Sequence, residues 1–200
     1  MTTEGFRLKT ARLILRAFVP GDRRDILALH NDPRVTAMLI DSVPDRPEIA
    51  HIYQVWAEGL YARGEPGPLH ASLADCGEFV GSFSLVRDED SGLLELGGRL
   101  FPKYWGSGLA FEGGRALVDE AFGARGESAL VSLGHPDNRA IDFVLARLGF
   151  VPRRFRDAFG KRAIEWYHDA ESWSLRERQP LTRREAARIA VNRRKMRDDP

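Results

Sequence analysis

Residues 103–110, KYWGSGLA, form the stretch of this chain that is best suited to bind an anion. The two glycines predict a short turn, and an apolar helical pattern follows it directly. A turn that opens into a helix directs unpaired backbone N–H groups and the positive end of the helix dipole at one point. This arrangement binds an anion without any cationic side chain, and phosphate is the ligand that we expect.

Two common phosphate motifs do not fit this turn. A Walker loop ends in Gly-Lys-Ser/Thr, and the turn has no such ending. A dinucleotide-binding fingerprint needs a third glycine at the position where this chain has Phe111. The turn therefore belongs to neither of these two classes.

The elements on either side of the turn must position it. Residues 93–101 are mostly small or apolar and predict a strand, which Pro102 ends because proline lacks a backbone donor. After the turn, apolar or small residues recur at intervals of three and four, which predicts an amphipathic helix. The residues of this stripe are Ala110, Gly114, Leu117, Val118, Ala121 and Phe122.

The segment KYWGSGLA resembles the acyl-CoA pyrophosphate loop of the GNAT family of N-acetyltransferases, whose pattern is Gln/Arg-x-x-Gly-x-Gly/Ala. Lys103, Gly106 and Gly108 take the first, fourth and sixth positions, and the lysine departs from the pattern. Two further segments, ARLILRAFVPGDRRDILALHNDPRVTAML and PDNRAIDFVLARLGFVPRR, look like the RimJ/RimL-type branch, which acetylates protein N-termini and other small amines. The resemblance spans about Thr10 to Arg154.

The resemblance implies an enzyme, an acetyl-CoA-dependent N-acetyltransferase with acetyl-CoA as cosubstrate and no metal. It implies the α+β (mixed α/β) GNAT acyl-CoA N-acyltransferase fold, a mixed, mostly antiparallel sheet flanked by helices. Asn138 would contact the pantetheine amides, and it could also cap a helix. Leu100 and Phe101 would offer free backbone groups to the pantetheine arm and the thioester carbonyl. The implied cofactor-binding residues are Leu100, Phe101, Lys103, Trp105, Gly106, Ser107, Gly108, Leu109, Ala110 and Asn138.

Acetyl transfer to an amine needs a held thioester, a deprotonated amine, a stabilised oxyanion and a proton for the departing thiolate. The resemblance implies Glu95 as the catalytic base, because it precedes the cofactor contacts near where family members often place a carboxylate. The low intrinsic pKa of a carboxylate favours a base that acts through a water molecule. The alternative is a strand glutamate that faces solvent and has no catalytic role.

The general acid departs from the family pattern. Many GNAT enzymes carry a tyrosine seven residues after the asparagine matched to Asn138, or a serine three residues after it. Here these positions are Leu145 and Ile141. The thiolate could leave unprotonated, another group could supply the proton, or the protein could bind acyl-CoA without efficient turnover. The other candidate donors are Tyr104, His135 and Tyr167.

Two expected helices near the start would form one wall of the acceptor site in this family. The first begins at Gly21 and ends near Pro33, and the second begins near Pro47. In the loop between them, Asp41 and Asp45 are candidates to attract a cationic amine, although each also fits ordinary turn chemistry. The expected buried stripe of the second helix is Ile49, Ile52, Tyr53, Trp56 and Leu60.

The remaining patterns complete an expected sheet. Alternating or β-rich runs predict strands, a helix follows the segment HPDN, and Gly149 ends that helix. The predicted strands are residues 12–18, 69–74, 78–86, 128–133, 150–154 and 162–168.

The composition excludes several classes of protein. The 200 residues, 43% of them hydrophobic, suffice for one domain with a real core, and they contain no apolar run of about 18 residues that could span a membrane. The segment MTTEGFRLKT has no apolar signal core, and Cys76 is the only cysteine, so we expect a cytoplasmic protein. The five histidines show no short ligand spacing, so we expect no metal site.

The C-terminal segment lies outside the family resemblance. We divide the chain into a GNAT domain, residues 1–173, and a basic helical extension, residues 174–200. Residues 176–197 hold nine basic and two acidic side chains, which leaves an acidic remainder that suits a cationic amine. Thr182 and Glu185 form a capping box, with Ala186, Ile189 and Ala190 on one helical face.

Two classes of function remain open from the sequence. The first is transfer of an acetyl group from acetyl-CoA to a primary amine, on a protein N-terminus or a small molecule, by direct attack in a ternary complex. The second is a noncatalytic acyl-CoA-binding module that docks on RNA or protein through the basic tail. For the tail we favour packing against its own domain or a second subunit, so a homodimer stays open and nucleic acid is not expected as a partner.

Overall fold

The computed structural model describes residues 6–41, 48–178 and 181–192. These residues form two compact units. The first unit contains residues 6–37, 48–86 and 97–116, and the second contains residues 38–41, 87–96 and the described residues from 117 onward. Strand β5, Leu94–Leu100, begins in the second unit and ends in the first. In the part of the chain that the structure describes, no helix is long and apolar enough to cross a membrane.

The first unit contains an antiparallel sheet in the order β1-β2-β3-β4. Its strands are β1 (Arg7–Lys9), β2 (Leu13–Ala17), β3 (Gly67–Leu73) and β4 (Phe79–Arg87). The predicted strands 12–18, 69–74 and 78–86 are confirmed, whereas the three-residue strand β1 was not expected. Leu13 and Leu15 alternate on the buried face of β2, which is the pattern that identified this strand in the sequence.

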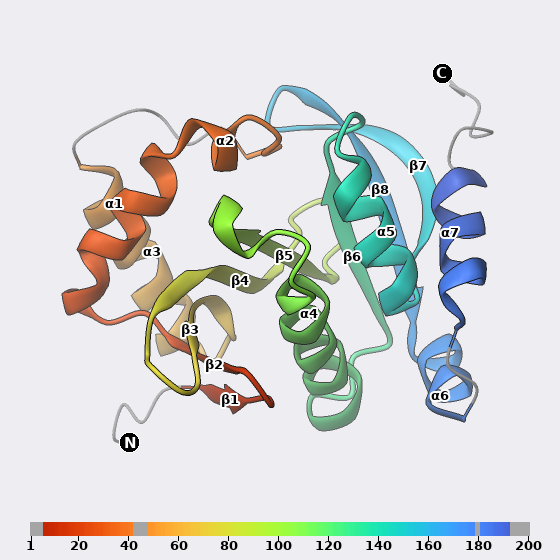
Figure 1. The fold of residues 1–200 in the computed structure, drawn as a ribbon, viewed down its shortest axis with the longest axis horizontal. Helices are drawn as coiled ribbons and strands as arrows, with labels where there is room; N and C mark the ends of the chain where they lie inside the picture. The colour runs from red at the N-terminus through yellow and green to blue at the C-terminus, as the bar shows by residue number, and fades with distance from the viewer. Residues whose placement is uncertain (1–5, 42–47, 179–180, 193–200) are drawn as a thin grey trace. The chain divides into compact units, whose positions relative to one another are not determined.

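The helices of the first unit are α1 (Arg23–Asn31), α2 (Pro33–Thr36) and α3 (Ile49–Ala62). Helices α1 and α3 lie side by side (Figure 1). The expected buried stripe of α3 is wrong in part, because Ile52 and Trp56 are 50% and 44% exposed. The buried face instead contains Ala57 and Gln54. Small residues let α3 pack closely, and Gln54 stays satisfied by hydrogen bonds with Arg23 and Glu58.

The second unit contains a mixed sheet in the order β5-β6-β8-β7. Its other strands are β6 (Ala129–Gly134), β7 (Val151–Ala158) and β8 (Lys161–Asp169). Strands β5 and β6 pair in parallel through Leu94–Leu130 and Glu95–Val131, and the other pairs are antiparallel. The predicted fold class, a mixed and mostly antiparallel sheet flanked by helices, is confirmed.

Helices α5 (Arg139–Leu148), α6 (Ala170–Arg178) and α7 (Arg183–Asn192) belong to the second unit. Helix α5 ends at Gly149, whose positive φ of 102° favours glycine at that position. Helix α7 packs against α5 and β7 with Ala186 fully buried (Figure 1). The packing of the tail helix on its own domain therefore agrees with the interpretation that we favoured from the sequence.

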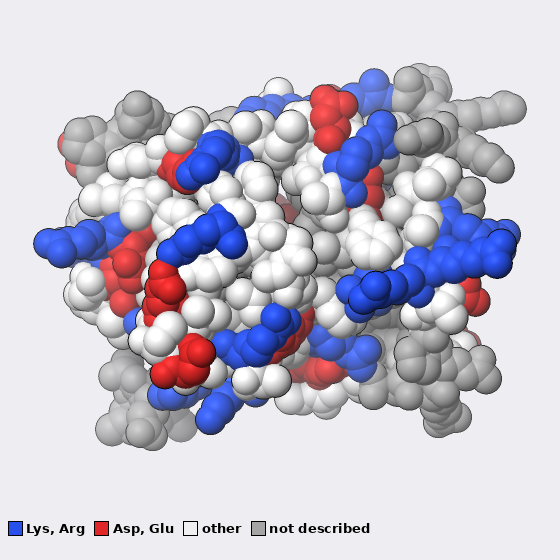
Figure 2. Space-filling view, in the orientation of Figure 1, with Lys and Arg blue, Asp and Glu red and all other residues white. Residues whose placement is uncertain are grey.

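The predicted capping box of α7 is also present. The backbone N–H of Thr182 donates to the Glu185 carboxylate, and the N–H of Glu185 donates to the Thr182 hydroxyl. Basic side chains gather on the α7 side of this unit in Figure 2, and the exposed arginines of α7 are Arg183, Arg184 and Arg188. Positive charge thus lies on the outer face of a helix whose inner face is packed.

Candidate active site

The predicted anion-binding turn lies between the end of β5 and the start of α4 (Leu109–Asp119). A short 3₁₀ turn, Pro102–Tyr104, follows the strand and ends regular pairing, as the sequence predicted. Gly106 and Gly108 then adopt φ angles of 74° and 85°. Residues other than glycine disfavour this left-handed conformation. A helix leaves its first N–H groups without an acceptor in the helix itself, and here the N–H of Leu109 donates to the Ser107 hydroxyl at 3.4 Å. A loop of this kind that opens into a helix has the geometry of an anion cradle.

Side chains of the loop are held by contacts within the first unit. The indole N–H of Trp105 donates to the carbonyl oxygen of Leu100 at 2.8 Å, and the Ser107 hydroxyl donates to the carbonyl oxygen of Tyr104 at 2.5 Å. The Lys103 ammonium pairs with the carboxylate of Glu78, which directly precedes β4. These contacts fix the loop before Gly106 and between the two glycines.

The backbone groups of Leu100 and Phe101 require a correction. We expected them to be free, but the N–H of Phe101 donates to Val80 at 3.0 Å and its carbonyl accepts from Tyr104 at 2.9 Å. The Leu100 carbonyl already accepts from the Trp105 indole. The 3₁₀ turn after Phe101 uses the Phe101 carbonyl, whereas the N–H of Phe101 and the carbonyl of Leu100 are used by Val80 and by the Trp105 side chain. A carbonyl oxygen has a second lone pair, so each carbonyl can still accept one further hydrogen bond.

Arg12 is a residue at this loop that the sequence analysis missed. Its Nε donates to Oε2 of Glu112 at 2.6 Å, and its Nη1 donates to the Ser107 carbonyl at 3.0 Å. Glu112 lies in the first turn of α4, 100 residues away in sequence. No local spacing links the two residues, so the sequence carried no signal for this contact.

A pocket of about 480 Å³ in the first unit adjoins the end of β5. Its lining residues are Arg34, Phe79, Phe101, Pro102 and Lys103. Arg34 comes from α2, between the two helices that the family resemblance assigned to the acceptor wall. Phe101 and Lys103 come from the cofactor set. The pocket therefore lies where a helical wall and the candidate cofactor segment meet.

Glu95 lies in the second unit, on the part of β5 that pairs with β6. Its side chain accepts a hydrogen bond from the backbone N–H of Leu133. Burial, with smaller contributions from the negative charges of Asp88 and Asp41, raises the pKa of Glu95 to about 7. The alternative that Glu95 is an ordinary strand glutamate facing solvent is therefore not supported, because its carboxyl group is shielded from solvent. A carboxyl group with this pKa can accept a proton near neutral pH.

Arg156 organises the other charges around Glu95. Its guanidinium, only 9% exposed, bonds to Asp88 and lies 3.1 Å from a carboxylate oxygen of Asp90. Burial opposes ionisation of Asp88, but hydrogen bonds from Arg156 and Ser91 outweigh it and lower the Asp88 pKa. Asp88 is thus ionised, and its charge acts on Glu95.

The other predicted residues of the second unit occupy plain structural positions. Asn138 caps α5, since its side-chain oxygen accepts from the N–H of Ile141 at 3.3 Å. His135 accepts from the N–H of Asp137 at 3.1 Å, and Arg153 lies over the ring of Tyr167. Tyr104, in the first unit, has a pKa raised by burial and by the Glu78 carboxylate. Asp41 is described, whereas Asp45 lies outside the described residues.

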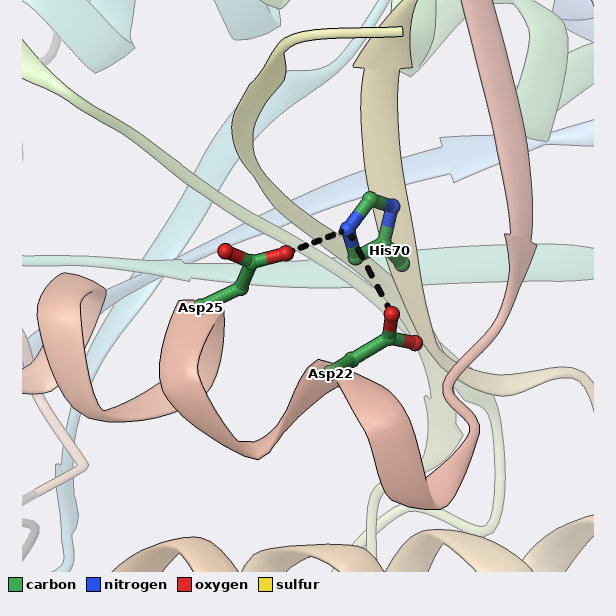
Figure 3. Close-up of side chains that lie close together, drawn as sticks. All are labelled: Asp22, Asp25 and His70. Carbon is green, nitrogen blue, oxygen red and sulfur yellow. Dashed lines mark hydrogen bonds and ion pairs between the residues drawn. The ribbon is translucent and has the colours of Figure 1, made fainter.

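Asp22, Asp25 and His70 form a second titratable group that the sequence spacing did not indicate (Figure 3). Their ligand atoms lie within 4.8 Å of one another, and Nε2 of His70 is 3.0 Å from Asp25 and 3.9 Å from Asp22. Both oxygens of Asp22 are already bonded to Arg16, at 2.6 and 2.8 Å. A metal ion would have to displace this guanidinium, so the group fits a structural ion pair better.

Comparison with known proteins agrees with this geometry. The profile of the acetyltransferase (GNAT) domain matches residues 12–151. The chain is 26% identical over 145 residues to the uncharacterized N-acetyltransferase YoaA of Bacillus subtilis (strain 168), which covers 72% of this chain and 81% of that protein.

Two solved structures share the fold. The ribosomal-protein-S5-alanine acetyltransferase from Vibrio fischeri has a TM-score of 0.68 at 16% identity, covering 84% of this chain and 98% of that one. The spermidine N-acetyltransferase from Vibrio cholerae, solved with CoA and spermine, has a TM-score of 0.68 at 15% identity, covering 82% and 99%. With the profile match covering most of its length, this chain belongs to the GNAT family of acetyl-CoA-dependent acetyltransferases.

Proposed function

We propose that the protein transfers the acetyl group of acetyl-CoA to a primary amine by direct attack of the amine on the thioester in a ternary complex. The acceptor is a protein N-terminus or a small-molecule amine, as in the RimJ/RimL-type branch. The observation that carries this proposal is Glu95, a half-buried carboxyl group whose pKa of about 7 suits a general base.

The glycine loop would hold the donor. In this proposal the CoA diphosphate rests on the N–H groups between Trp105 and Ala110, and the pantetheine arm extends past Leu100 and Phe101. The left-handed glycines and the start of α4 directly after them support this placement. Alignment of two bound reactants can supply about 7 to 11 kcal/mol of the barrier, so holding the donor is a large part of catalysis.

Glu95 would act on the amine through a water molecule. An ammonium ion cannot attack a thioester, so one proton must leave before the reaction. A carboxylate with a pKa of about 7 is a stronger base than an exposed glutamate, and it is still largely ionised in mildly alkaline solution. Ile141 and Leu145 occupy the positions of the usual acids, so solvent supplies the proton to the departing thiolate in this scheme.

The charges near Glu95 favour a cationic acceptor. Asp88 and Asp41 both add negative potential at Glu95, and a protonated amine is attracted by such a field. The two solved neighbours are named for different acceptors, a ribosomal protein and spermidine. A test must therefore include both peptides and polyamines.

The experiment is a thiol-release assay with acetyl-CoA and a panel of acceptors: peptides with different N-terminal residues, spermidine, spermine and aminoglycosides. We expect CoA thiol above background with at least one amine, and acetylated product by mass spectrometry. Binding of acetyl-CoA with no thiol release across the whole panel would contradict the proposal. An acetylated hydroxyl in place of an acetylated amine would contradict the acceptor class.

A further inference from the structure

We propose that Arg12 is a further cofactor-binding residue, whose guanidinium contacts the CoA diphosphate beside Gly108. This inference rests on the proposed function, because it requires CoA at the glycine loop. The sequence resemblance assigned this site to backbone groups and Lys103. The structure turns Lys103 towards Glu78 and brings a different cation to the loop.

The contacts of Arg12 leave one part of its guanidinium available. Nε is used by Glu112 and Nη1 by the carbonyl of Ser107. Nη2 has no acceptor among the residues that the structure describes, and it lies 3.4 Å from where a Cβ on Gly108 would stand. Because the Arg12 side chain is 50% exposed, this free donor can reach a ligand bound at the turn.

The anchor of Arg12 is itself well fixed. One carboxylate oxygen of Glu112 accepts from the Thr10 hydroxyl at 2.6 Å and from the Arg12 backbone N–H at 2.8 Å, and the other accepts from the Arg12 side chain. Burial opposes the charge of Glu112, but these bonds prevail and lower its pKa. A guanidinium held in this way donates to a phosphate with little further loss of side-chain freedom.

Charge balance at the turn points in the same direction. An ionised glutamate in the first turn of α4 would repel a diphosphate bound at that helix end. Arg12 neutralises this charge and adds a donor on the ligand side of the pair. Without Arg12, the negative charge of Glu112 would remain beside the bound diphosphate with no cation to neutralise it.

The competing explanation is that the Arg12–Glu112 pair only joins the start of β2 to α4. A purely structural pair would affect every substrate alike. A diphosphate contact affects only ligands that carry the diphosphate. Acetyl-pantetheine has the reacting thioester without the nucleotide, so a comparison of the two donors separates the explanations.

The first test measures CoA binding by calorimetry for Arg12→Gln, with Arg63→Gln as the matched control. Arg63 is also exposed and ion-paired, to Glu65 at 2.9 Å, and among the described residues this side chain forms no hydrogen bond or ion pair with the loop. We expect Arg12→Gln to weaken CoA binding about tenfold, with a smaller salt dependence, and the control to bind like wild type. Arg12→Lys keeps the positive charge but loses the planar set of guanidinium donors, so its affinity for CoA should lie between those of Arg12→Gln and wild type.

The second test compares kcat/KM for acetyl-CoA and acetyl-pantetheine. We expect Arg12→Gln to lose about tenfold with acetyl-CoA and to match wild type with acetyl-pantetheine. Equal losses with both donors, or CoA binding as tight as in the Arg63→Gln control, would overturn the inference alone. Failure of the wild-type protein to bind CoA would instead overturn the proposed function, and the inference with it.

Discussion

Asp22 in the first unit and Glu95 in the second are two shielded carboxyl groups with opposite surroundings. Asp22 receives two bonds from Arg16 and one from the N–H of Val19, and these lower its pKa although burial alone would raise it. The Glu95 carboxylate accepts one hydrogen bond, from the backbone N–H of Leu133. Burial and the negative charges of Asp88 and Asp41 raise its pKa to about 7. The nearby arginine, Arg156, is committed to Asp88.

The difference shows which carboxyl groups are available for chemistry. A buried carboxylate matched by a guanidinium is locked in the charged form and contributes to folding. A buried carboxyl without such a partner exchanges its proton near neutral pH, at a cost in stability when it ionises. In this protein the first kind holds α1 to β2, and the second kind is the candidate base.

The largest effect should come from removing the candidate base. Glu95→Gln keeps an acceptor for the Leu133 N–H but cannot take a proton, so we expect kcat to fall about 10²- to 10⁴-fold with CoA affinity unchanged. Steady-state kinetics with the best amine of the panel, beside calorimetry with CoA, make the measurement. A kcat of Glu95→Gln within about threefold of the wild-type value would show that Glu95 is not the base.

The same variant should change how stability depends on pH. The pKa of Glu95 is raised from 4.5 to about 7 on folding, so the folded state is favoured below pH 4.5 and loses stability as pH rises towards 7. Wild type should therefore lose up to about 3 kcal/mol of unfolding free energy relative to Glu95→Gln between pH 4.5 and 8. Urea unfolding of both proteins at several pH values measures this difference. The same dependence of unfolding free energy on pH in both proteins would contradict the prediction.

Breaking the matched pair in the first unit should cost stability and leave chemistry intact. Arg16→Gln leaves Asp22 with a single backbone donor, so we expect a loss of about 2 to 3 kcal/mol, reduced from the fully buried case because Arg16 is 31% exposed. Urea unfolding at pH 7 measures the loss, with Arg63→Gln as the control that should show none. Equal stabilities for the two variants would contradict a structural role for the Arg16–Asp22 pair.

The smallest effect should come from one of the charges near Glu95. Asp41→Asn removes a negative charge but leaves Arg156 and Asp88 in place, so the pKa of Glu95 should fall by less than about one unit. Titration of the Glu95 carboxyl carbon by ¹³C NMR in both proteins measures the shift. A raised or unchanged pKa in the variant would show that Asp41 does not act on Glu95.

The sequence predicted those parts of the site that local spacing encodes. The glycine turn, the strand before it and the helix after it follow from consecutive residues, and so do the Gly149 end of α5 and the capping box of α7. The fold class followed from these patterns together with the family resemblance. In each case neighbours in sequence are neighbours in space, so the physical cause is visible in one short stretch.

The parts that were missed depend on residues far apart in the chain. Arg12 meets Glu112, and Asp88 meets Arg156, across separations that no periodicity encodes. The buried face of α3 was misjudged because Gln54 finds a polar partner, Arg23, on another helix, while Trp56 is exposed. The N–H of Phe101 was thought free, but it donates to the carbonyl oxygen of Val80, a residue from a distant part of the sequence. Tertiary contacts decided each of these outcomes.

The pH dependence of kcat/KM for the best amine tests most directly whether Glu95 is the base. In wild type we predict an inflection near pH 7, below which the rate falls tenfold per pH unit, in addition to any inflection from the amine itself. In Glu95→Gln the residual rate should lack the inflection near pH 7. The same inflection in both proteins would contradict the account.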